Sequence, residues 1–298
     1  MTANPAAASA PPPKPKRRRR IGWIITVTLL SLAVLGVGAL LVLTYLRLQE
    51  ALTVIEQQND LIDEKQTFSA AMTDLVAKTT EFDGIKVGAL VPQDRLDLLA
   101  ARGWLNRRDA DAMSGVTSDV RAEIASLDGL LTTAAQQAAE NSSDTTYEAT
   151  IDALGGGFVV TAIDNADKLC HDDVLGCVAG DDPYTVHIDK ADTKLPYMTS
   201  FIRKGLSFHE FAHVLQYTNP VASDEAVKSF KGDYEKMADC FALAYLKGWK
   251  LHHTVWVSDF EYYEVDVGYG YTCNSKQKAL IREWYEGLGY ASQPITQD

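Results

Sequence analysis

The sequence predicts an α+β protein in which an N-terminal transmembrane helix leads through a helical stalk into a mostly helical domain with a small sheet. Three observations support this prediction. Residues 21–46 carry no charge, helical periodicity extends to about residue 140, and short strand patterns mixed with amphipathic helices follow. A chain of 298 residues has room for one sizeable core with accessory parts, or for two modest domains.

The uncharged stretch 21–46 is longer than the roughly 20 residues that cross a bilayer core. A cleaved signal peptide has a shorter apolar region of about 7–15 residues, so an uncleaved signal anchor is favoured. Lys14, Lys16 and Arg17 to Arg20 directly precede the span, and such clusters stay in the cytoplasm. We therefore expect a single-pass protein of the cell membrane with a disordered cytoplasmic Pro/Arg tail over residues 1–20 and an extracytoplasmic remainder.

The part of the chain after the span is acidic. Six of the 28 Lys and Arg residues precede it, which leaves 22 basic against 40 acidic residues, a net charge of −18. This balance argues against nucleic acid as a partner. The run of four arginines could also be a nuclear signal, but its place next to a span favours the topological interpretation.

Four cysteines lie on the expected exported side, where an even number favours disulfides with three possible pairings. Cys170 and Cys177 flank a loop short enough to close locally, so the pairs Cys170–Cys177 and Cys240–Cys273 are favoured. A Cys/His zinc site is the alternative, and it lacks the usual C-x-x-C or H-x(3–5)-H spacing.

Residues 47–140 are predicted to form a helical stalk or accessory region. A short heptad-like apolar stripe begins it, with Asn59 in the same register: Leu48, Leu52, Ile55 and Ile62. The stripe ends before three full heptads, so we expect at most weak dimerisation through the stalk. Pro92 precedes a predicted helix, and residues 120–139 are amphipathic.

A polar, turn-rich segment at residues 141–148 marks the start of the last predicted domain, residues 141–298. Within it, two segments have strand patterns: 155–163 and 183–189. Three segments have helical patterns: about 196–217, 233–248 and 275–289.

The segment H-E-F-A-H, residues 209–213, lies in the first of these helices. Residues i and i+4 share a helix face, so His209 and His213 would direct two imidazoles at one point. Glu210 is rotated by about 100° from that line and is placed to act as a general base on water.

The next helix offers a third ligand. Catalytic zinc usually takes three protein ligands, and Glu235 supplies a carboxylate. Asp239 lies one turn later, where it can accept the second ring N–H of a ligand histidine. The sequence therefore predicts one Zn²⁺. Asp259 or Glu261 could replace Glu235, although no motif supports either.

H-E-x-x-H followed some twenty residues later by E-x-x-x-D resembles the gluzincin metallopeptidases. The segment YEKMADCFA is similar to the E-x-x-A-D-C-x-A of bacterial neutral zinc metallopeptidases, and the resemblance covers residues 206–277. It implies a zincin-like fold and a disulfide from Cys240 to a later cysteine. It also assigns roles to five residues: zinc ligation to His209, His213 and Glu235, water activation to Glu210, and support to Asp239. Gln216 and Asn219 stand where a metzincin needs Gly and His, so that subclass is excluded.

The function implied is that of a membrane-anchored extracytoplasmic zinc metallopeptidase acting on peptides or proteins. A residue that stabilises the oxyanion is expected but fixed by no motif, and the candidates, each of which could equally be a surface or packing residue, are His252, His253, Tyr269 and Tyr271. Residues 183–189 could be an edge strand that binds substrate by strand addition.

Three other interpretations remain open on the sequence. One is hydrolysis of a non-protein amide such as a cell-wall crosslink. Another is a non-catalytic cell-surface binding module that retains a zincin fold. The last is a structural stalk protein in which H-E-F-A-H is a buried turn, although two histidines and a glutamate are costly to bury unpaired.

Overall fold

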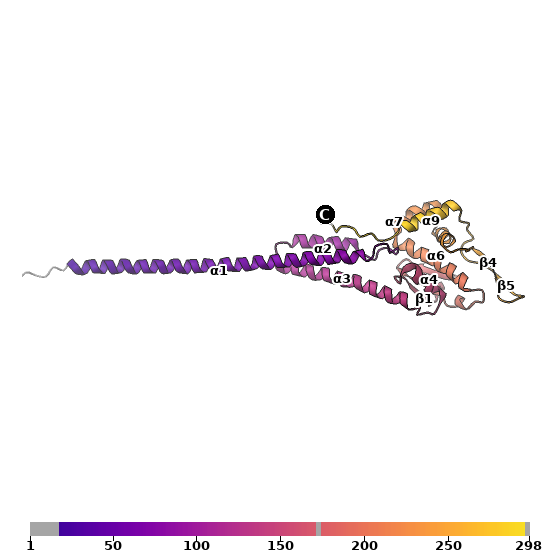
Figure 1. The fold of residues 1–298 in the computed structure, drawn as a ribbon, viewed down its shortest axis with the longest axis horizontal. Coiled ribbons are helices and arrows are strands. Elements are labelled where there is room, and N and C mark those ends of the chain that lie inside the picture. The colour runs from indigo at the N-terminus through magenta and orange to yellow at the C-terminus, as the bar shows by residue number, and fades with distance from the viewer. Residues whose placement is uncertain (1–17, 171–173, 296–298) are drawn as a thin grey trace, which may run out of the picture. The chain divides into compact units, whose positions relative to one another are not determined.

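A computed structural model describes residues 18–170 and 174–295 and shows a mixed α+β protein (Figure 1). The chain divides into two compact units, residues 1–62 and 63–298. The predicted boundary at residue 140 falls at the end of a helix inside the second unit. The predicted division into tail, anchor, stalk and last domain stays a prediction.

The helix α1 spans Arg18–Thr80, and its part up to Ile62 makes up the described part of unit 1. Of the described helices, α1 alone is long and apolar enough from residue 22 onward to cross a membrane, which agrees with the predicted span. Over residues 23–46 the large apolar side chains of α1 are exposed, as lipid contact requires. The predicted disordered tail lies outside the described residues, except that Arg18 to Arg20 begin α1.

The predicted helical stalk is helical, and α1 continues without a break to Thr80. Residues 63–80 of α1 belong to unit 2, where they pack with α2 (Gln93–Leu105) and α3 (Ala110–Ala139) around a core that includes Leu75, Leu96 and Val120. Gly103 lies against the ring of Phe68, and a Cβ on it would come 2.1 Å from that ring and force the ring to move.

The rest of unit 2 has short helices and strands between longer helices. In chain order they are α4 (Thr146–Gly155), β1 (Val160–Asp164), α5 (Ala166–Leu169), β2 (Gly176–Ala179), β3 (Asp182–Asp189), η1 (Asp192–Lys194), α6 (Ser200–Thr218), α7 (Pro220–Ala226), η2 (Val227–Phe230), α8 (Tyr234–Tyr245), β4 (His252–Trp256), β5 (Tyr262–Asp266) and α9 (Ser275–Gly287). The three predicted helices are α6, α8 and α9. The predicted strand 155–163 is wrong in its first half: Gly155 ends α4, and Gly156 caps that helix in the left-handed conformation with φ 61°.

Two small sheets are present in the described part. One has the order β1-β3-β2, with β1 parallel and β2 antiparallel to β3, and the other is the β4–β5 hairpin. The strand predicted at residues 183–189 is β3, and it is central. The expectation that it offers a free edge is therefore wrong, because β1 pairs with one of its edges and β2, which sequence reasoning missed, pairs with the other.

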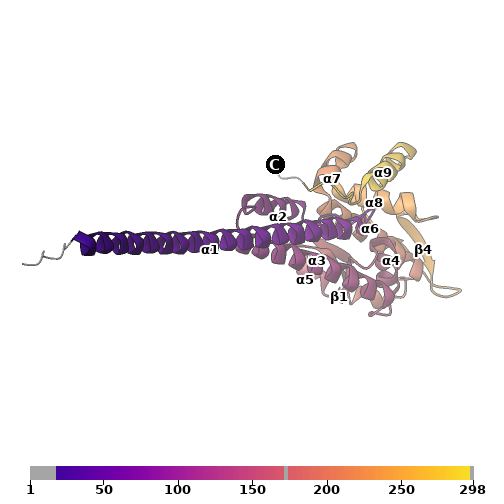
Figure 2. The ribbon, with the colours of Figure 1, turned by 60° about the vertical axis from the view of Figure 1, so that its left-hand side comes forward.

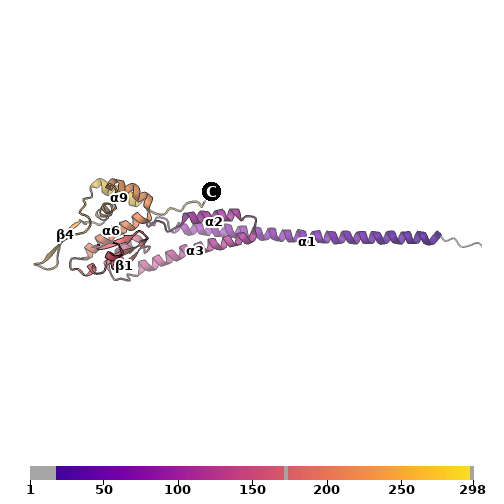
Figure 3. The ribbon, with the colours of Figure 1, turned by 180° about the vertical axis from the view of Figure 1, so that it is seen from behind.

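The helix α6 lies between the three-stranded sheet and the helices α8 and α9, as all three views show (Figures 1, 2 and 3). Its buried side chains, among them Phe211, Val214 and Leu215, pack against Phe241 of α8 and against β3. The helix α6 is thus the middle layer of three, and packing on two sides fixes the positions of its side chains.

Both predicted disulfides are present, Cys170–Cys177 and Cys240–Cys273. The second joins α8 to the segment before α9. Because all four cysteines are paired, the Cys/His zinc site is excluded. Disulfides are typical of an oxidising, extracellular compartment, in agreement with the exported side expected for this unit.

Candidate metal centre

Two capped helices supply the predicted ligands. In α6 the Thr199 hydroxyl accepts the Ile202 N–H at 3.3 Å, and in α8 the Asp233 carboxylate accepts the Lys236 N–H at 3.1 Å. The helix α6 ends at Thr218, before Asn219 and Pro220, because a residue that precedes proline is disfavoured in the helical conformation. The connection through α7 and η2 lets α8 pack across α6, so that Glu235 comes to face the histidine row.

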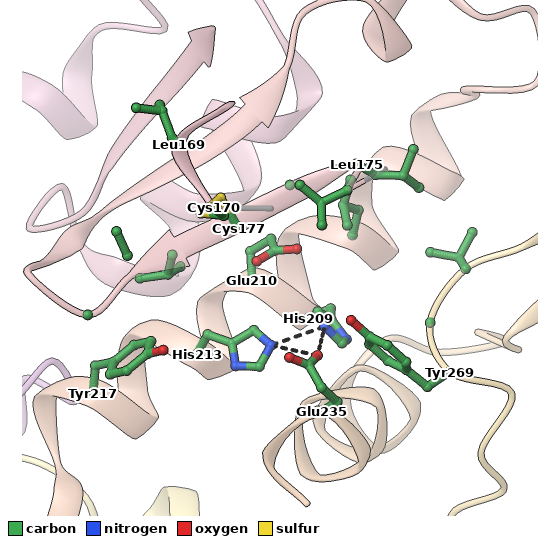
Figure 4. Close-up of a pocket in the computed structure, with 18 of the residues that line it drawn as sticks. Leu169, Cys170, Leu175, Cys177, His209, Glu210, His213, Tyr217, Glu235 and Tyr269 are labelled. Atoms are coloured by element: carbon green, nitrogen blue, oxygen red, sulfur yellow. Dashed lines mark hydrogen bonds and ion pairs between the residues drawn. A yellow bond between two sulfur atoms is a disulfide. The ribbon is translucent and has the colours of Figure 1, made fainter. Parts of the chain in front are cut away.

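His209, His213 and Glu235 converge on one point (Figure 4). The two Nε2 atoms are 3.2 Å apart, and Oε2 of Glu235 is 3.1 Å from each. Tetrahedral zinc with ligand bonds of about 2.0–2.2 Å needs donor atoms roughly 3.3 Å apart. This triangle of two imidazole nitrogens and a carboxylate oxygen therefore fits a small divalent ion of that kind.

Each ligand histidine is oriented through its other ring nitrogen. Nδ1 of His209 is 2.9 Å from Oδ1 of the buried Asp239, as predicted. Nδ1 of His213 is 2.8 Å from Oε1 of Gln216, whose amide nitrogen donates to the carbonyl of Tyr234 at 3.0 Å. Both Nε2 atoms are thereby left free to act as ligands.

Sequence reasoning missed the role of Gln216 and used the residue only to exclude a metzincin. The sequence feature that could have revealed this role is the position of Gln216 three residues after His213, on the same helix face. Its contact with the first turn of α8 depends on how the two helices cross, and no local pattern reveals that.

The electrostatics of the cluster favour a cation. Burial alone would lower the pKa of His209, but its hydrogen bonds with Asp239 and Glu235 outweigh burial and raise the pKa to about 10. Burial would raise the pKa of Glu235, yet the two histidines hold it well below the ordinary value. Without a metal, the carboxylates hold a proton on His209, so a metal ion has to displace that proton.

Glu210 lies between the ligand histidines and β2 and lines the same cavity (Figure 4). It is buried, and burial raises its pKa, although the neighbouring His209 and His213 oppose the rise. A Cβ on Gly176 would lie 3.2 Å from Oε1 of Glu210, so the glycine leaves this carboxylate its room. A buried carboxylate with a raised pKa in a cavity is suited to general acid–base work.

The cavity has a volume of about 720 Å³ and runs between β2 and the segment 266–269. Among the described residues that line it, none is Lys or Arg, whereas Asp181 and Asp266 lie on it in addition to Glu210 and Glu235. The cavity is therefore a groove of negative charge with an edge strand on one side.

Of the four candidates for oxyanion stabilisation, the structure brings only Tyr269 to the centre. Its ring lies 6.3 Å from that of His209, and its backbone N–H donates to Oδ2 of Asp239 at 2.9 Å. Burial and the nearby carboxylates, Glu235 first, raise the pKa of the phenol, so it remains a hydrogen-bond donor.

Asp239 thus positions a ligand and the Tyr269 backbone together. Gly268, which sequence reasoning also missed, permits this contact, because a Cβ on it would come 2.2 Å from Oδ1 of Asp239. Its φ of +100° is a second reason for a glycine.

The other candidates lie elsewhere. His252 contacts Glu264 and Asp266 on the outer face of the hairpin, and His253 contacts the carbonyl of Lys250 and the ring of Trp249. Tyr271 accepts a hydrogen bond from Gln277.

The alternative ligands Asp259 and Glu261 lie in the turn between β4 and β5, outside the ligand group.

Comparison of the chain with protein-family models, with characterised proteins and with solved structures returned no significant match. The site therefore has to be interpreted from its own geometry.

Proposed function

We propose that this chain is a membrane-anchored, extracytoplasmic zinc metallopeptidase, in line with its resemblance to gluzincins. The observation that carries the proposal is the placement of Glu210: a buried carboxylate lies in one cavity with three convergent ligand atoms. Structural zinc sites are closed by four protein ligands, whereas three ligands leave one position open for water. A carboxylate such as Glu210, which could act on that water, has no role in a purely structural site.

His209, His213 and Glu235 would hold the ion, and Zn²⁺ bound there would supply a Lewis acid that polarises water and a scissile carbonyl group. Glu210 takes a proton from the attacking water and delivers it to the leaving amine, as a carboxyl group with a raised pKa can. Tyr269 donates its phenolic hydrogen to the oxyanion that develops. Asp239 and Gln216 hold the two imidazoles in the tautomer that leaves Nε2 free.

In the described part of the chain β2 is an edge strand of its sheet and forms one wall of the cavity, where an extended peptide could be added as a further strand. The substrate would then lie as an additional strand with a carbonyl group between Glu210 and Tyr269. This replaces the strand at residues 183–189 as the expected binding edge.

The first test concerns the metal. The full-length protein in detergent should contain one zinc per chain by elemental analysis, and His213→Ala should lose it. The matched control is His252→Ala, which removes an exposed histidine outside the site. Equal zinc in His213→Ala and wild type would refute the assigned site and favour a structural role for H-E-F-A-H.

The second test concerns catalysis. Glu210→Gln should keep its zinc and lose cleavage of a mixed peptide library, whereas Glu225→Gln, an exposed glutamate on α7, should cleave normally. Tyr269→Phe should lower kcat with little change in KM. If Glu210→Gln cleaves as wild type does, or no peptide is cleaved at full zinc occupancy, the non-catalytic binding module becomes the better conclusion.

A further inference from the structure

The β4–β5 hairpin has one packed face and one bare face. Val255 and Val265 are buried, and Tyr263 packs on Tyr197 with ring centroids 5.4 Å apart. Residues alternate between the faces, and three cross-strand pairs occupy the bare one: His252 with Asp266, Thr254 with Glu264, and Trp256 with Tyr262. We call these six residues the outer strip. The hairpin projects from the helices of its unit (Figures 1 and 3).

The far end of the outer strip exposes large aromatic side chains. Trp256 is 62% exposed and Tyr262 52%, and their rings lie 4.9 Å apart. Phe260, in the turn beyond them, is 96% exposed. Trp256 and Tyr262 pack on each other rather than on the core, so the fold gains little from them. Clustered exposed aromatics are typical of contact surfaces.

The near end of the outer strip carries carboxylates. Glu264 and Asp266 are exposed, and each is 2.8 Å from a ring nitrogen of the exposed His252. Residues 251–273 contain four carboxylates, two histidines and no Lys or Arg. Carboxylates beside aromatic faces attract Lys and Arg, through ion pairs and cation–π contacts together.

The outer strip is continuous with the metal centre. Asp266 belongs both to the strip and to the cavity wall, and the chain runs directly from it through Gly268 to Tyr269. The cavity itself has no Lys or Arg in its described lining. Over about 16 Å, the length of a five-residue strand, a chain lying along the strip would pass the rings of Trp256 and Tyr262 and then the carboxylates of Glu264 and Asp266 before it entered the cavity. Lys250 lines a second cavity beside this near end of the strip.

We propose that the outer strip docks an extended, Lys/Arg-rich segment of the protein substrate and presents the adjoining residues to the metal centre. The presentation step rests on the proposed peptidase function, whereas the docking step does not. Lys or Arg side chains contact the faces of Trp256 and Tyr262 and displace His252 from Glu264 and Asp266. An anionic lipid surface is the poorer occupant, because the four carboxylates would be repelled by it.

The test is a binding measurement that needs no turnover. Full-length Glu210→Gln protein in nonionic detergent is titrated against a fluorescein-labelled Lys/Arg-rich peptide and against a Glu-rich peptide of equal length, with fluorescence anisotropy as readout. The basic peptide should bind, and added salt should weaken it. Trp256→Ala with Tyr262→Ala, and separately Glu264→Gln with Asp266→Asn, should each weaken binding about tenfold.

The matched control is Trp104→Ala, which removes a tryptophan from α2 that is 52% exposed and should bind as the parent does. In the background with intact Glu210, the aromatic double variant should cleave a short uncharged peptide as before and a peptide with a basic extension more slowly, through a higher KM.

Equal binding of the two peptides, or unchanged binding in both double variants, would overturn the docking proposal. So would a result in which the aromatic double variant loses only binding to vesicles of phosphatidylglycerol and phosphatidylcholine. Binding through the strip by a protein that proves to lack peptidase activity would refute the proposed function and leave docking intact.

Discussion

Two buried glutamates in unit 2, Glu148 and Glu210, have opposite environments. Glu148, on α4, receives hydrogen bonds from the Ser142 N–H and hydroxyl at 2.9 and 2.8 Å, and from Gln137 at 3.2 Å. Burial opposes its ionisation, but the donors of Ser143 and Ser142 outweigh burial and lower its pKa. Glu210 faces a cavity, and there burial prevails and raises the pKa.

The difference teaches how to distinguish a structural carboxylate from a reactive one. A carboxylate surrounded by donors is held ionised and joins chain segments, as Glu148 joins the end of α3 to α4. A carboxylate left without such donors beside a cavity costs stability, and such a residue persists where function requires it.

The largest expected effect separates the two residues by activity. Glu210→Gln should lower peptide cleavage by about 10³-fold, within the range for loss of a general base. The melting temperature of the metal-free protein should be unchanged or higher, because a buried carboxylate has been neutralised. Glu148→Gln should show the reverse pattern, with retained cleavage and a lower melting temperature. If the two variants changed cleavage and melting temperature in the same way, the assignment of Glu210 as a reactive carboxylate and Glu148 as a structural one would be wrong.

The next effect is on stability. Glu148→Ala removes the acceptor for the backbone N–H of Ser142 and of Ser143. Loss of these hydrogen bonds to a charged carboxylate should lower the free energy of unfolding by about 2 kcal/mol. Urea denaturation measures this, with Glu140→Ala, at the exposed end of α3, as a control expected to be neutral. Zinc content should not change in either variant.

These residues also show how far the sequence could lead. Helical spacing places His209 and His213 on one face, with Glu210 beside them, and puts Glu235 and Asp239 on one face of a second helix. The choice of Glu235 over Asp259 or Glu261 comes from the resemblance to gluzincins, and its convergence with the histidines depends on how α8 crosses α6. Gln216 and Gly268 support that centre through contacts between elements distant in sequence, which a local pattern does not encode.

The elements of the fold also separate into those that local sequence patterns predict and those that they do not. The uncharged span, the helix starting after Pro92 and the three helices of the last domain have periodicity or caps that predict them. The strand β2 has four residues, too few to show alternation, and missing it made β3 appear to be the edge. Of the four aromatic and histidine candidates, only the tertiary position of the segment 266–269 selects Tyr269.

A third prediction tests whether Asp239 unites the centre with Tyr269. Gly268→Ala would place a Cβ against the Asp239 carboxylate, and we expect about tenfold weaker zinc binding, measured by competition with a chelator. Gly270→Ala is the matched control, since its φ is also positive, at +68°, but nothing lies within 4 Å of the added Cβ. Equal loss in both variants would show backbone strain rather than displacement of Asp239.

The smallest expected effect extends the comparison to Asp152, one turn after Glu148. Burial, and then the charge of Glu148, raise the pKa of Asp152 to about 6, and its Oδ1 has no hydrogen-bond partner in the described structure. Because the folded-state pKa exceeds the unfolded value, the protonated form favours folding below about pH 4, and this contribution is lost as pH rises through about 6. Asp152→Asn should therefore stabilise the protein at pH 7 by about 1 kcal/mol, allowing for partial solvent screening, and by less at pH 4. Thermal unfolding of both proteins at the two pH values measures the difference. An equal gain at both values would mean that Asp152 is already neutral at pH 7 or is fully solvated, and that Glu148 alone is the buried charge on α4.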